Sequence, residues 1–169
     1  SVLLVFTTAG KVFPINVYEV PQAGRNAKGR PIVNLLNIPK DEQISGLVSL
    51  QSEDGRISGD DETDLLFISR KGLVKRTPTK AFLNLRQGGM IAAGVADDDA
   101  LMTVRRIEVK DTHVMLLTKA GKCIRFDIND VPVFGRSARG NRGVALSSED
   151  AVIDALLVPP EDHSALEDG

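Results

Sequence analysis

The chain has 169 residues, of which 42% are hydrophobic, so it can bury a core either as one domain or as an array of smaller units. One cysteine, Cys123, excludes an intrachain disulfide and fits a reducing cytoplasm, and no apolar run approaches the roughly 20 residues of a membrane-spanning helix. With no tryptophan and one tyrosine, the composition argues against single-strand binding on a platform of aromatic rings.

The net charge of −2 is slightly acidic, but the charged residues are segregated along the chain. Six basic residues and no acidic one lie between residues 65 and 90. Six more lie between residues 119 and 143, against only Asp127 and Asp130. The acidic residues gather instead in the segments 53–64, 97–99 and 161–168. Such segregation predicts a local positive potential. This potential favours a nucleic-acid ligand despite the slightly negative net charge.

Three segments align without gaps, at residues 3–12, 65–74 and 114–123. Each contains an apolar run, a short polar turn that ends in glycine, and a second apolar run. This pattern is typical of a hairpin whose type I turn is followed by a residue in the left-handed region, where a Cβ atom is disfavoured. We therefore expect Gly10, Gly72 and Gly121 to be turn residues rather than a phosphate cradle.

Each aligned hairpin is followed by two further strand-sized runs, which predicts an all-β protein made of four-stranded units. The expected third and fourth strands are 31–36 and 43–50, 90–95 and 100–109, and 143–146 and 151–158. About 50–60 residues per four strands is the size of a propeller blade. We expect blades at 2–50, 64–109 and 113–158, followed by an acidic tail at 159–169. Three blades do not close a normal ring, and the chain starts in an apolar run, so we expect a fragment of a larger disc.

A second repeated feature precedes the third strand of each unit. Residues 24–33 and 135–144 share the pattern Gly-Arg-x-Ala-(Lys/Arg)-Gly, followed by another arginine, and residues 86–94 carry a shorter, altered form. Glycines let a backbone approach a ligand, and arginine or lysine side chains bind phosphate oxygens. The loops therefore predict phosphate contact without reading of bases. They lack the Gly-Lys-Ser/Thr ending of a P-loop.

Four runs have a distinctive sequence: VYEVP at 17–21, GRPIVNLL at 29–36, FISRKGLVKRT at 67–77 and RGNRGV at 139–144. These runs resemble the C-terminal domain of the DNA gyrase A subunit. The resemblance covers residues 2 to 158, and it extends to a close relative, the topoisomerase IV A subunit.

The resemblance implies a β-pinwheel, a propeller-like disc of usually six blades that exchange strands with their neighbours. It also implies a positively charged rim that bends duplex DNA and supports negative supercoiling. The implied partners are the rest of the gyrase A subunit and the gyrase B subunit. The implied location is the bacterial cytoplasm, at the nucleoid. The residues expected to contact DNA are the basic ones of the turns and loops: Lys11, Arg25, Lys28, Arg30, Arg70, Lys71, Lys75, Arg76, Arg86, Lys119, Lys122, Arg125, Arg136, Arg139 and Arg142.

One departure from the family keeps two alternatives open. Gyrase carries the box Gln-Arg-Arg-Gly-Gly-Lys-Gly, whereas the nearest segment here, residues 86–89, lacks the arginine pair and the lysine. The topoisomerase IV A subunit, in which this domain steers the choice of DNA substrate, is therefore an alternative. A propeller that serves as a scaffold for protein partners is another.

Catalysis by this chain is not expected. His113 precedes a strand and His163 lies in the acidic tail, so no catalytic triad or metal-ligand spacing is formed, and no cofactor is implied. The DNA-cleaving tyrosine of the family lies outside the part that this chain resembles, and Tyr18 is interpreted as a packing residue at a strand end. The acidic run 97–99 is interpreted as a solvated loop rather than a cation site.

Overall fold

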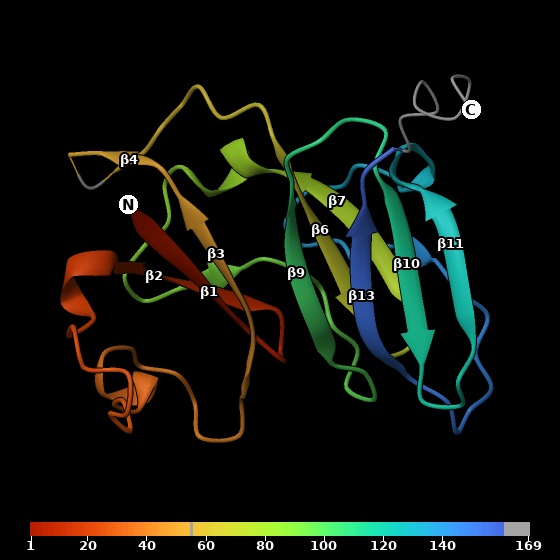
Figure 1. The fold of residues 1–169 in the computed structure, drawn as a ribbon, viewed down its shortest axis with the longest axis horizontal. Coiled ribbons are helices and arrows are strands. Elements are labelled where there is room, and N and C mark those ends of the chain that lie inside the picture. The colour runs from red at the N-terminus through yellow and green to blue at the C-terminus, as the bar shows by residue number, and fades with distance from the viewer. Residues whose placement is uncertain (55, 161–169) are drawn as a thin grey trace, which may run out of the picture.

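A computed structural model describes residues 1–54 and 56–160 of the chain. Three antiparallel sheets stand side by side in a curved row (Figure 1), which confirms the prediction of an all-β, propeller-like protein of about three blades. Within the described ranges no helix is long and apolar enough to cross a membrane. The acidic tail predicted for 159–169 falls, from residue 161 onward, outside the described part.

Each sheet is built on one hairpin plus a returning strand that pairs with the first strand of that hairpin. The hairpin strands are β1 (Val2–Thr7) and β2 (Lys11–Asn16), β6 (Asp64–Ser69) and β7 (Leu73–Pro78), and β10 (His113–Thr118) and β11 (Cys123–Asp127). The returning strands are β3 (Ile44–Leu50), β9 (Leu101–Ile107) and β13 (Val152–Val158). Gly10, Gly72 and Gly121 close the hairpins with φ of +84°, +89° and +82°, which confirms their predicted role.

The fourth strand of a sheet comes from the following unit, as the strand exchange of a pinwheel implies. Strand β8 (Met90–Ile91) lies in the second unit of the sequence but pairs with β2 of the first. Strand β12 (Asn141–Arg142) lies in the third unit and pairs with β7 of the second. The third sheet contains β11, β10 and β13 among the described residues.

The prediction of a third strand at 31–36 is wrong. Residues Ile32–Asn34 form the 3-10 helix η2, in which the backbone N–H of Leu35 donates to the Ile32 carbonyl at 2.9 Å. The corresponding segments of the other units become strands only where they meet the edge of a preceding sheet. In the described chain no sheet precedes the first one, so this segment satisfies its own backbone groups locally. The third strand predicted at 90–95 is shorter, at Met90–Ile91, and the one predicted at 143–146 is misplaced, since the strand lies just before it at Asn141–Arg142.

The units repeat in detail beyond their strands. The pairing register shifts at the last residue of β1, β6 and β10, at Thr7, Ser69 and Thr118. A 3-10 helix follows the second strand of each hairpin: η1 at Val17–Glu19, η3 at Thr79–Phe82 and η4 at Ile128–Asp130. These elements fix the equivalence of positions from one unit to the next.

The core lies between adjacent sheets rather than within one of them. Phe6 of the first sheet packs edge-on against Phe67 of the second, with ring centroids 5.5 Å apart, and Phe82 of η3 completes the group. A second cluster joins Leu66 and Ile68 of the second sheet to Leu116 of the third, among other residues. Each sheet therefore depends on its neighbour to bury its apolar faces.

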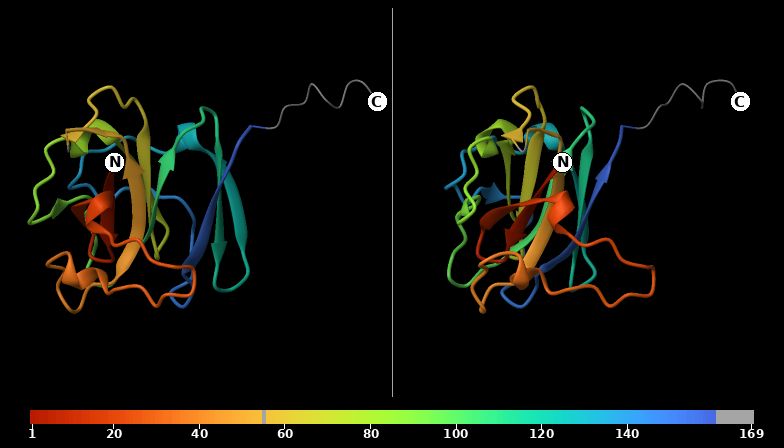
Figure 2. Two further views of the ribbon diagram at one scale, coloured as in Figure 1. Left: turned by 60° about the vertical axis from the view of Figure 1, so that its left-hand side comes forward. Right: turned by 90° about the vertical axis from the view of Figure 1, so that its left-hand side faces the viewer.

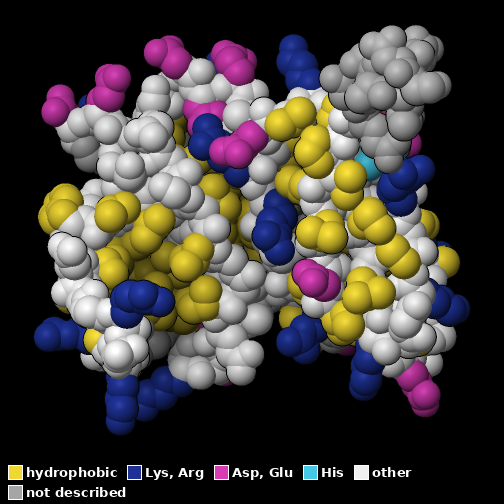
Figure 3. Space-filling view, in the orientation of Figure 1, with side chains coloured by type: hydrophobic (Ala, Val, Ile, Leu, Met, Phe, Trp, Pro, Cys, Tyr) yellow, Lys and Arg dark blue, Asp and Glu magenta, His cyan; other side chains and the backbone are white. Residues whose placement is uncertain are grey.

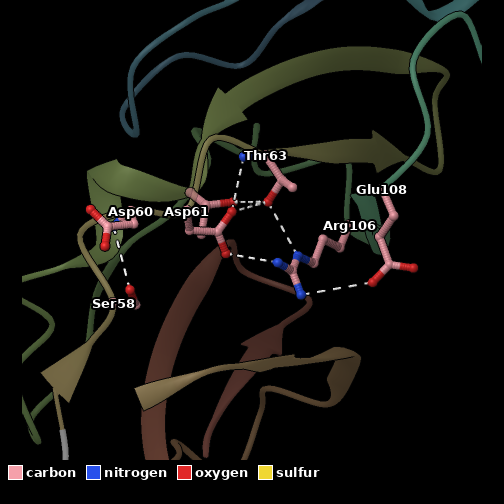
Figure 4. A network of polar contacts seen from close by, with 7 residues as sticks. Ser58, Asp60, Asp61, Thr63, Arg106 and Glu108 are labelled. Atoms are coloured by element: carbon pink, nitrogen blue, oxygen red, sulfur yellow. Dashed lines mark hydrogen bonds and ion pairs between the residues drawn. The ribbon is translucent and has the colours of Figure 1, made fainter. Parts of the chain in front are cut away.

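The linker between the first two units carries the short hairpin β4 (Ser52–Glu53) and β5 (Arg56–Ile57). One ion pair and one hydrogen bond join it to β9 (Figure 4). The Arg106 guanidinium donates to Asp61 at 2.9 Å and to the Thr63 hydroxyl at 3.2 Å. Burial raises the pKa of Asp61, but hydrogen bonds from Thr63 and the charge of Arg106 outweigh it, so this pKa lies below its usual value. Arg106 of the second sheet thus neutralises part of the negative charge of the linker.

Replacement of Gly140 by alanine is expected to destabilise the chain. Gly140 has φ of +98°, and a Cβ atom there would lie 2.4 Å from the Val74 carbonyl oxygen. Because left-handed strain and overpacking add, Gly140→Ala is expected to lower the free energy of unfolding by roughly 2 to 4 kcal/mol. Gly135→Ala is the matched control, since no atom lies within 4 Å of its Cβ position. It should change stability by less than about 0.5 kcal/mol in urea unfolding, and equal effects would contradict the docking of β12.

Candidate nucleic-acid interface

The three hairpin turns lie along one edge of the molecule. Strands β1, β6 and β10 all run towards the lower margin of Figure 1, so the turns that follow them meet at that margin. In the space-filling view, lysine and arginine side chains gather along the same margin, and acidic side chains gather at the upper left, above β4 (Figure 3). The exposed basic residues of the turns are Arg70, Lys71, Lys119 and Lys122.

The glycine loop of the third unit is bound to the outer edge of the second sheet by backbone hydrogen bonds. The N–H of Phe134 donates to the Arg76 carbonyl at 2.8 Å, and the N–H of Gly143 donates to the Gly72 carbonyl at 2.7 Å. Two arginines of this segment, Arg139 and Arg142, project into solvent. The loop backbone is therefore fixed while its charges stay available.

The glycine loop of the first unit is not supported in this way. Arg25, Lys28 and Arg30 are exposed, and Figure 2 shows their segment, in orange-red, standing away from the sheets. Within the loop, the N–H of Ala27 donates to the Gly24 carbonyl at 3.0 Å. The sequence pattern placed this loop and 135–142 at equivalent positions of the first and third units, and only the loop of the third unit is hydrogen-bonded to a neighbouring sheet.

Lys75 is a correction to the predicted set, because its side chain is completely buried. The ammonium group donates to the carbonyls of Ala92 at 2.8 Å, Gly135 at 2.9 Å and Arg136 at 3.2 Å. It also lies 4.8 Å from the centroid of the Phe67 ring. Lys75 cannot reach a phosphate from this position, and it holds the backbones of the second and third units together. Burial lowers its pKa to about 8.

Three more predicted residues are paired with acidic groups. Arg76 is mostly buried, and it donates to the Val131 carbonyl at 2.8 Å and lies 3.4 Å from Asp64. Lys11 lies 3.2 Å from Glu42. Lys71 pairs with Asp98 of the acidic run 97–99, and this hydrogen bond and charge lower the pKa of Asp98. The acidic run thus caps a hairpin turn, since Asp99 also accepts from the backbone N–H of Lys71 at 3.0 Å.

The other predicted residues make no ion pair with any residue of the described ranges. Arg136 is half-buried and donates to the Ile91 carbonyl at 3.4 Å. The exposed members of this group are Arg25, Lys28, Arg30, Arg70, Arg86, Lys119, Lys122, Arg125, Arg139 and Arg142. They come from all three units, and their charges are available to a polyanion. Among the described residues no group of three or more His, Cys, Asp or Glu side chains could hold a metal ion.

The anchoring role of Lys75 was missed by the sequence reasoning, although the alignment of the units carries a signal for it. The hairpin equivalence places Lys75 at the position of Phe13, which is buried in the first sheet. A basic residue at a position that is apolar in a sister unit indicates a side chain that points inward.

Comparison with known proteins agrees with this architecture. The family model described as the DNA gyrase C-terminal domain, beta-propeller, matches residues 1–51, 63–108 and 112–159. The chain belongs to this family. The DNA gyrase A subunit from Synechocystis is 35% identical over 161 residues, and that from Haloquadratum walsbyi is 39% identical over 163 residues. These alignments cover 94% and 95% of the chain but only 18% of each relative.

Two solved structures show the same fold. The C-terminal domain of DNA topoisomerase IV superposes with a TM-score of 0.81 at 26% identity, over 95% of the chain and 48% of that domain. The DNA gyrase A C-terminal domain superposes with a TM-score of 0.68 at 24% identity, over 92% of the chain and 47% of that domain. The three units therefore match about half of each solved domain.

Substitution of Lys75 by methionine tests its anchoring role. The change leaves three buried carbonyls without a donor and is expected to cost about 3 kcal/mol of stability at pH 7. The folded pKa is about 8 and the ordinary value is 10.5, so above pH 8 the unfolded chain holds a proton that the folded chain has released. The stability of the wild type relative to Lys75→Met should thus rise by about 1 kcal/mol per pH unit between these values. Urea unfolding at several pH values measures this, and a constant difference would contradict the buried ammonium.

Proposed function

We propose that the chain binds duplex DNA through its phosphates and bends it, as a non-catalytic part of a gyrase A subunit that supports negative supercoiling. The observation that carries the proposal is a set of exposed basic side chains, contributed by all three units, that form no ion pair within residues 1–54 and 56–160. In the whole enzyme the chain would act with the rest of the A subunit and with the B subunit, in the cytoplasm. DNA cleavage would belong to a tyrosine outside this chain.

Electrostatics supports contact with the backbone of DNA rather than with its bases. Arginine and lysine side chains on turns and loops neutralise phosphates, and the released counterions drive binding. No helix of a size that could enter the major groove is present among the described residues, where all helices are short 3-10 turns. Binding is therefore expected to tolerate any sequence and to weaken steeply with salt.

Bending requires that the contacts be held in a fixed arrangement. The arginines at 139 and 142 are carried by a segment that is hydrogen-bonded to the second sheet. Bending a site of 20–30 base pairs costs roughly 1 to 6 kcal/mol. A rigid support lets many modest phosphate contacts together offset this cost.

A second candidate is the topoisomerase IV A subunit, in which this domain would steer the choice of DNA substrate. The TM-score of 0.81 with the solved topoisomerase IV domain favours it. Supercoiling assays with the complete enzyme separate the two, since gyrase introduces negative supercoils and the second candidate would only relax or unlink DNA. A third reading, a scaffold for protein partners, predicts no shift of plasmid DNA.

Substitution of the supported arginines is expected to weaken DNA binding without unfolding the protein. Arg136→Gln, Arg139→Gln and Arg142→Gln together remove three positive charges from one segment. The slope of log K against log salt should fall by up to about 0.9 per lost phosphate contact. Gel-shift titrations of a linear duplex at two salt concentrations measure this.

The matched control removes basic residues on the acidic side of the molecule. Lys80 pairs with Glu62 of the linker at 2.6 Å, and Lys110 follows β9. Lys80→Gln with Lys110→Gln should leave the salt slope unchanged. Wild-type binding that does not respond to salt, or equal losses in both variants, would overturn the phosphate model.

A further inference from the structure

The glycine loop of the third unit turns three consecutive carbonyl groups into the molecule. The Thr77 hydroxyl donates to the Phe134 carbonyl at 2.9 Å. The Lys75 ammonium donates to the Gly135 carbonyl at 2.9 Å and to the Arg136 carbonyl at 3.2 Å. Because Thr77 and Lys75 are completely buried, these three carbonyls point inward from the surface.

The N–H groups of the same peptide units point the other way. In a trans peptide the N–H lies opposite to the C=O, and no peptide among the described residues is cis. The N–H groups of Gly135, Arg136 and Ser137 therefore face away from the buried side chains, towards solvent. None of the three donates to an acceptor within residues 1–54 and 56–160. The loop thus presents three consecutive donors that remain available to a ligand.

Neighbouring segments hold this arrangement in place. The N–H of Ala138 donates to the Gly135 carbonyl at 3.4 Å and closes a β-turn. The Ala138 carbonyl in turn accepts from the N–H of Gly94 at 3.0 Å. A Cβ atom at Gly94 would lie 2.6 Å from the Ser137 carbonyl oxygen, so the turn packs directly on the backbone of the second unit. The three donors are therefore fixed before any ligand arrives.

The charges around the turn favour an anion. The Lys75 ammonium lies beneath the peptide units of the turn, and their N–H dipoles direct their positive ends outward. The exposed side chains of Arg139 and Arg142 add positive charge on the same segment and make no ion pair within the described ranges. Successive backbone N–H groups of this kind form anion-binding concavities. A phosphate group fits such a set of donors, because its oxygens carry negative charge and accept several hydrogen bonds.

The first unit contains the same turn without this support. The N–H of Ala27 donates to the Gly24 carbonyl at 3.0 Å, which repeats the β-turn of the third unit. Phe13 takes the place of Lys75 and has no side-chain donor. Within the described ranges no hydrogen bond from a sheet reaches the carbonyls of residues 24–26. The two loops thus share a sequence pattern and differ in whether their carbonyls are held.

We propose that the N–H groups of Gly135, Arg136 and Ser137 bind the oxygens of one phosphate group of duplex DNA. The inference rests on the DNA binding proposed above, and it adds main-chain donors to the arginine side chains of the same loop. A main-chain contact of this kind carries no base information, but it fixes where the backbone of the duplex meets the protein. Binding to these donors orders no side chain, so it avoids the entropy cost of an arginine contact.

Amide resonances of the 169-residue chain in solution NMR test the proposal. On addition of a short duplex at low salt, the amide protons of Gly135, Arg136 and Ser137 are expected to move downfield, because they come to donate to a charged oxygen. Their exchange with solvent is expected to slow by about fivefold or more, as for one added hydrogen bond. The amides of residues 24–26 are the reference, and they should move much less.

Each outcome bears on the inference or on the proposed function. If the duplex binds with a steep salt dependence while these three amides stay unmoved, the inference is overturned and the proposed function stands. If no duplex binds even at low salt, both are overturned. Inorganic phosphate at constant ionic strength is a second probe. Shifts with phosphate and none with the duplex overturn DNA as the source of the phosphate group.

Two variants of Arg136 isolate one N–H group. Arg136→Pro and Arg136→Ala both lose the guanidinium, but only the proline variant also lacks the N–H. Position 136 is the second residue of the β-turn, where proline is tolerated. Arg136→Pro is expected to bind the duplex about fivefold more weakly than Arg136→Ala. Equal affinities of the two folded variants overturn the contact, and if Arg136→Pro does not fold, the amide shifts of the wild type decide.

The matched pair in the first unit is Arg25→Pro and Arg25→Ala. Arg25 is the second residue of the equivalent turn, whose carbonyls are not held by a sheet within the described ranges. These two variants are expected to bind the duplex equally. The same difference in this pair as in the Arg136 pair overturns the inference, because the effect would then belong to any proline in a basic loop. Circular dichroism of all four variants checks that the fold is retained.

Discussion

The structure depends on one constraint, namely that a unit does not complete its own sheet. The second sheet acquires its outer strand from Asn141–Arg142, 63 residues after the end of β7, which makes the third unit part of the second. The same holds for β8 on β2. Because apolar faces are also shared between neighbours, neither edge pairing nor burial can be satisfied by one unit alone. The row therefore behaves as one cooperative body.

The exchanged segments surround a buried charge that belongs to the second sheet, the Lys75 ammonium group of β7. Taking an ammonium group out of water is expensive, and Lys75 is tolerated because three carbonyl oxygens and an aromatic ring surround it. Those carbonyls belong to the segment around Ala92 and to the glycine loop at Gly135, which come from different units. A single side chain thus couples the outer edges of the first two sheets to the basic loop. In the first sheet the equivalent position is occupied by the buried, apolar Phe13, which cannot form these hydrogen bonds.

The hairpins were predictable and the exchanged strands were not, for physical reasons. Continuous apolar runs of four or five residues are followed by a polar turn that ends in a glycine of positive φ, so Gly10 and its two equivalents revealed the three units. A strand of two residues is too short to show a pattern, and its partner is set by tertiary position rather than by local sequence. The segment 31–36 has the composition of a strand but lacks a sheet edge to join, and so it forms a 3-10 turn. Basic character alone likewise could not separate the buried Lys75 from the exposed Arg139.

Strand exchange also bears on how a basic loop could bend DNA. A lysine on a flexible loop attracts the duplex but cannot hold it in a curve. Because DNA is stiff, the loop changes its conformation before the DNA bends. The loop of the third unit cannot move in this way, since its backbone is bonded to the second sheet on both sides of Arg139. The loop of the first unit carries equal charge, yet it has no sheet behind it. The loop of the first unit would therefore add attraction for the duplex, whereas the loop of the third unit would also supply the rigid support that bending needs.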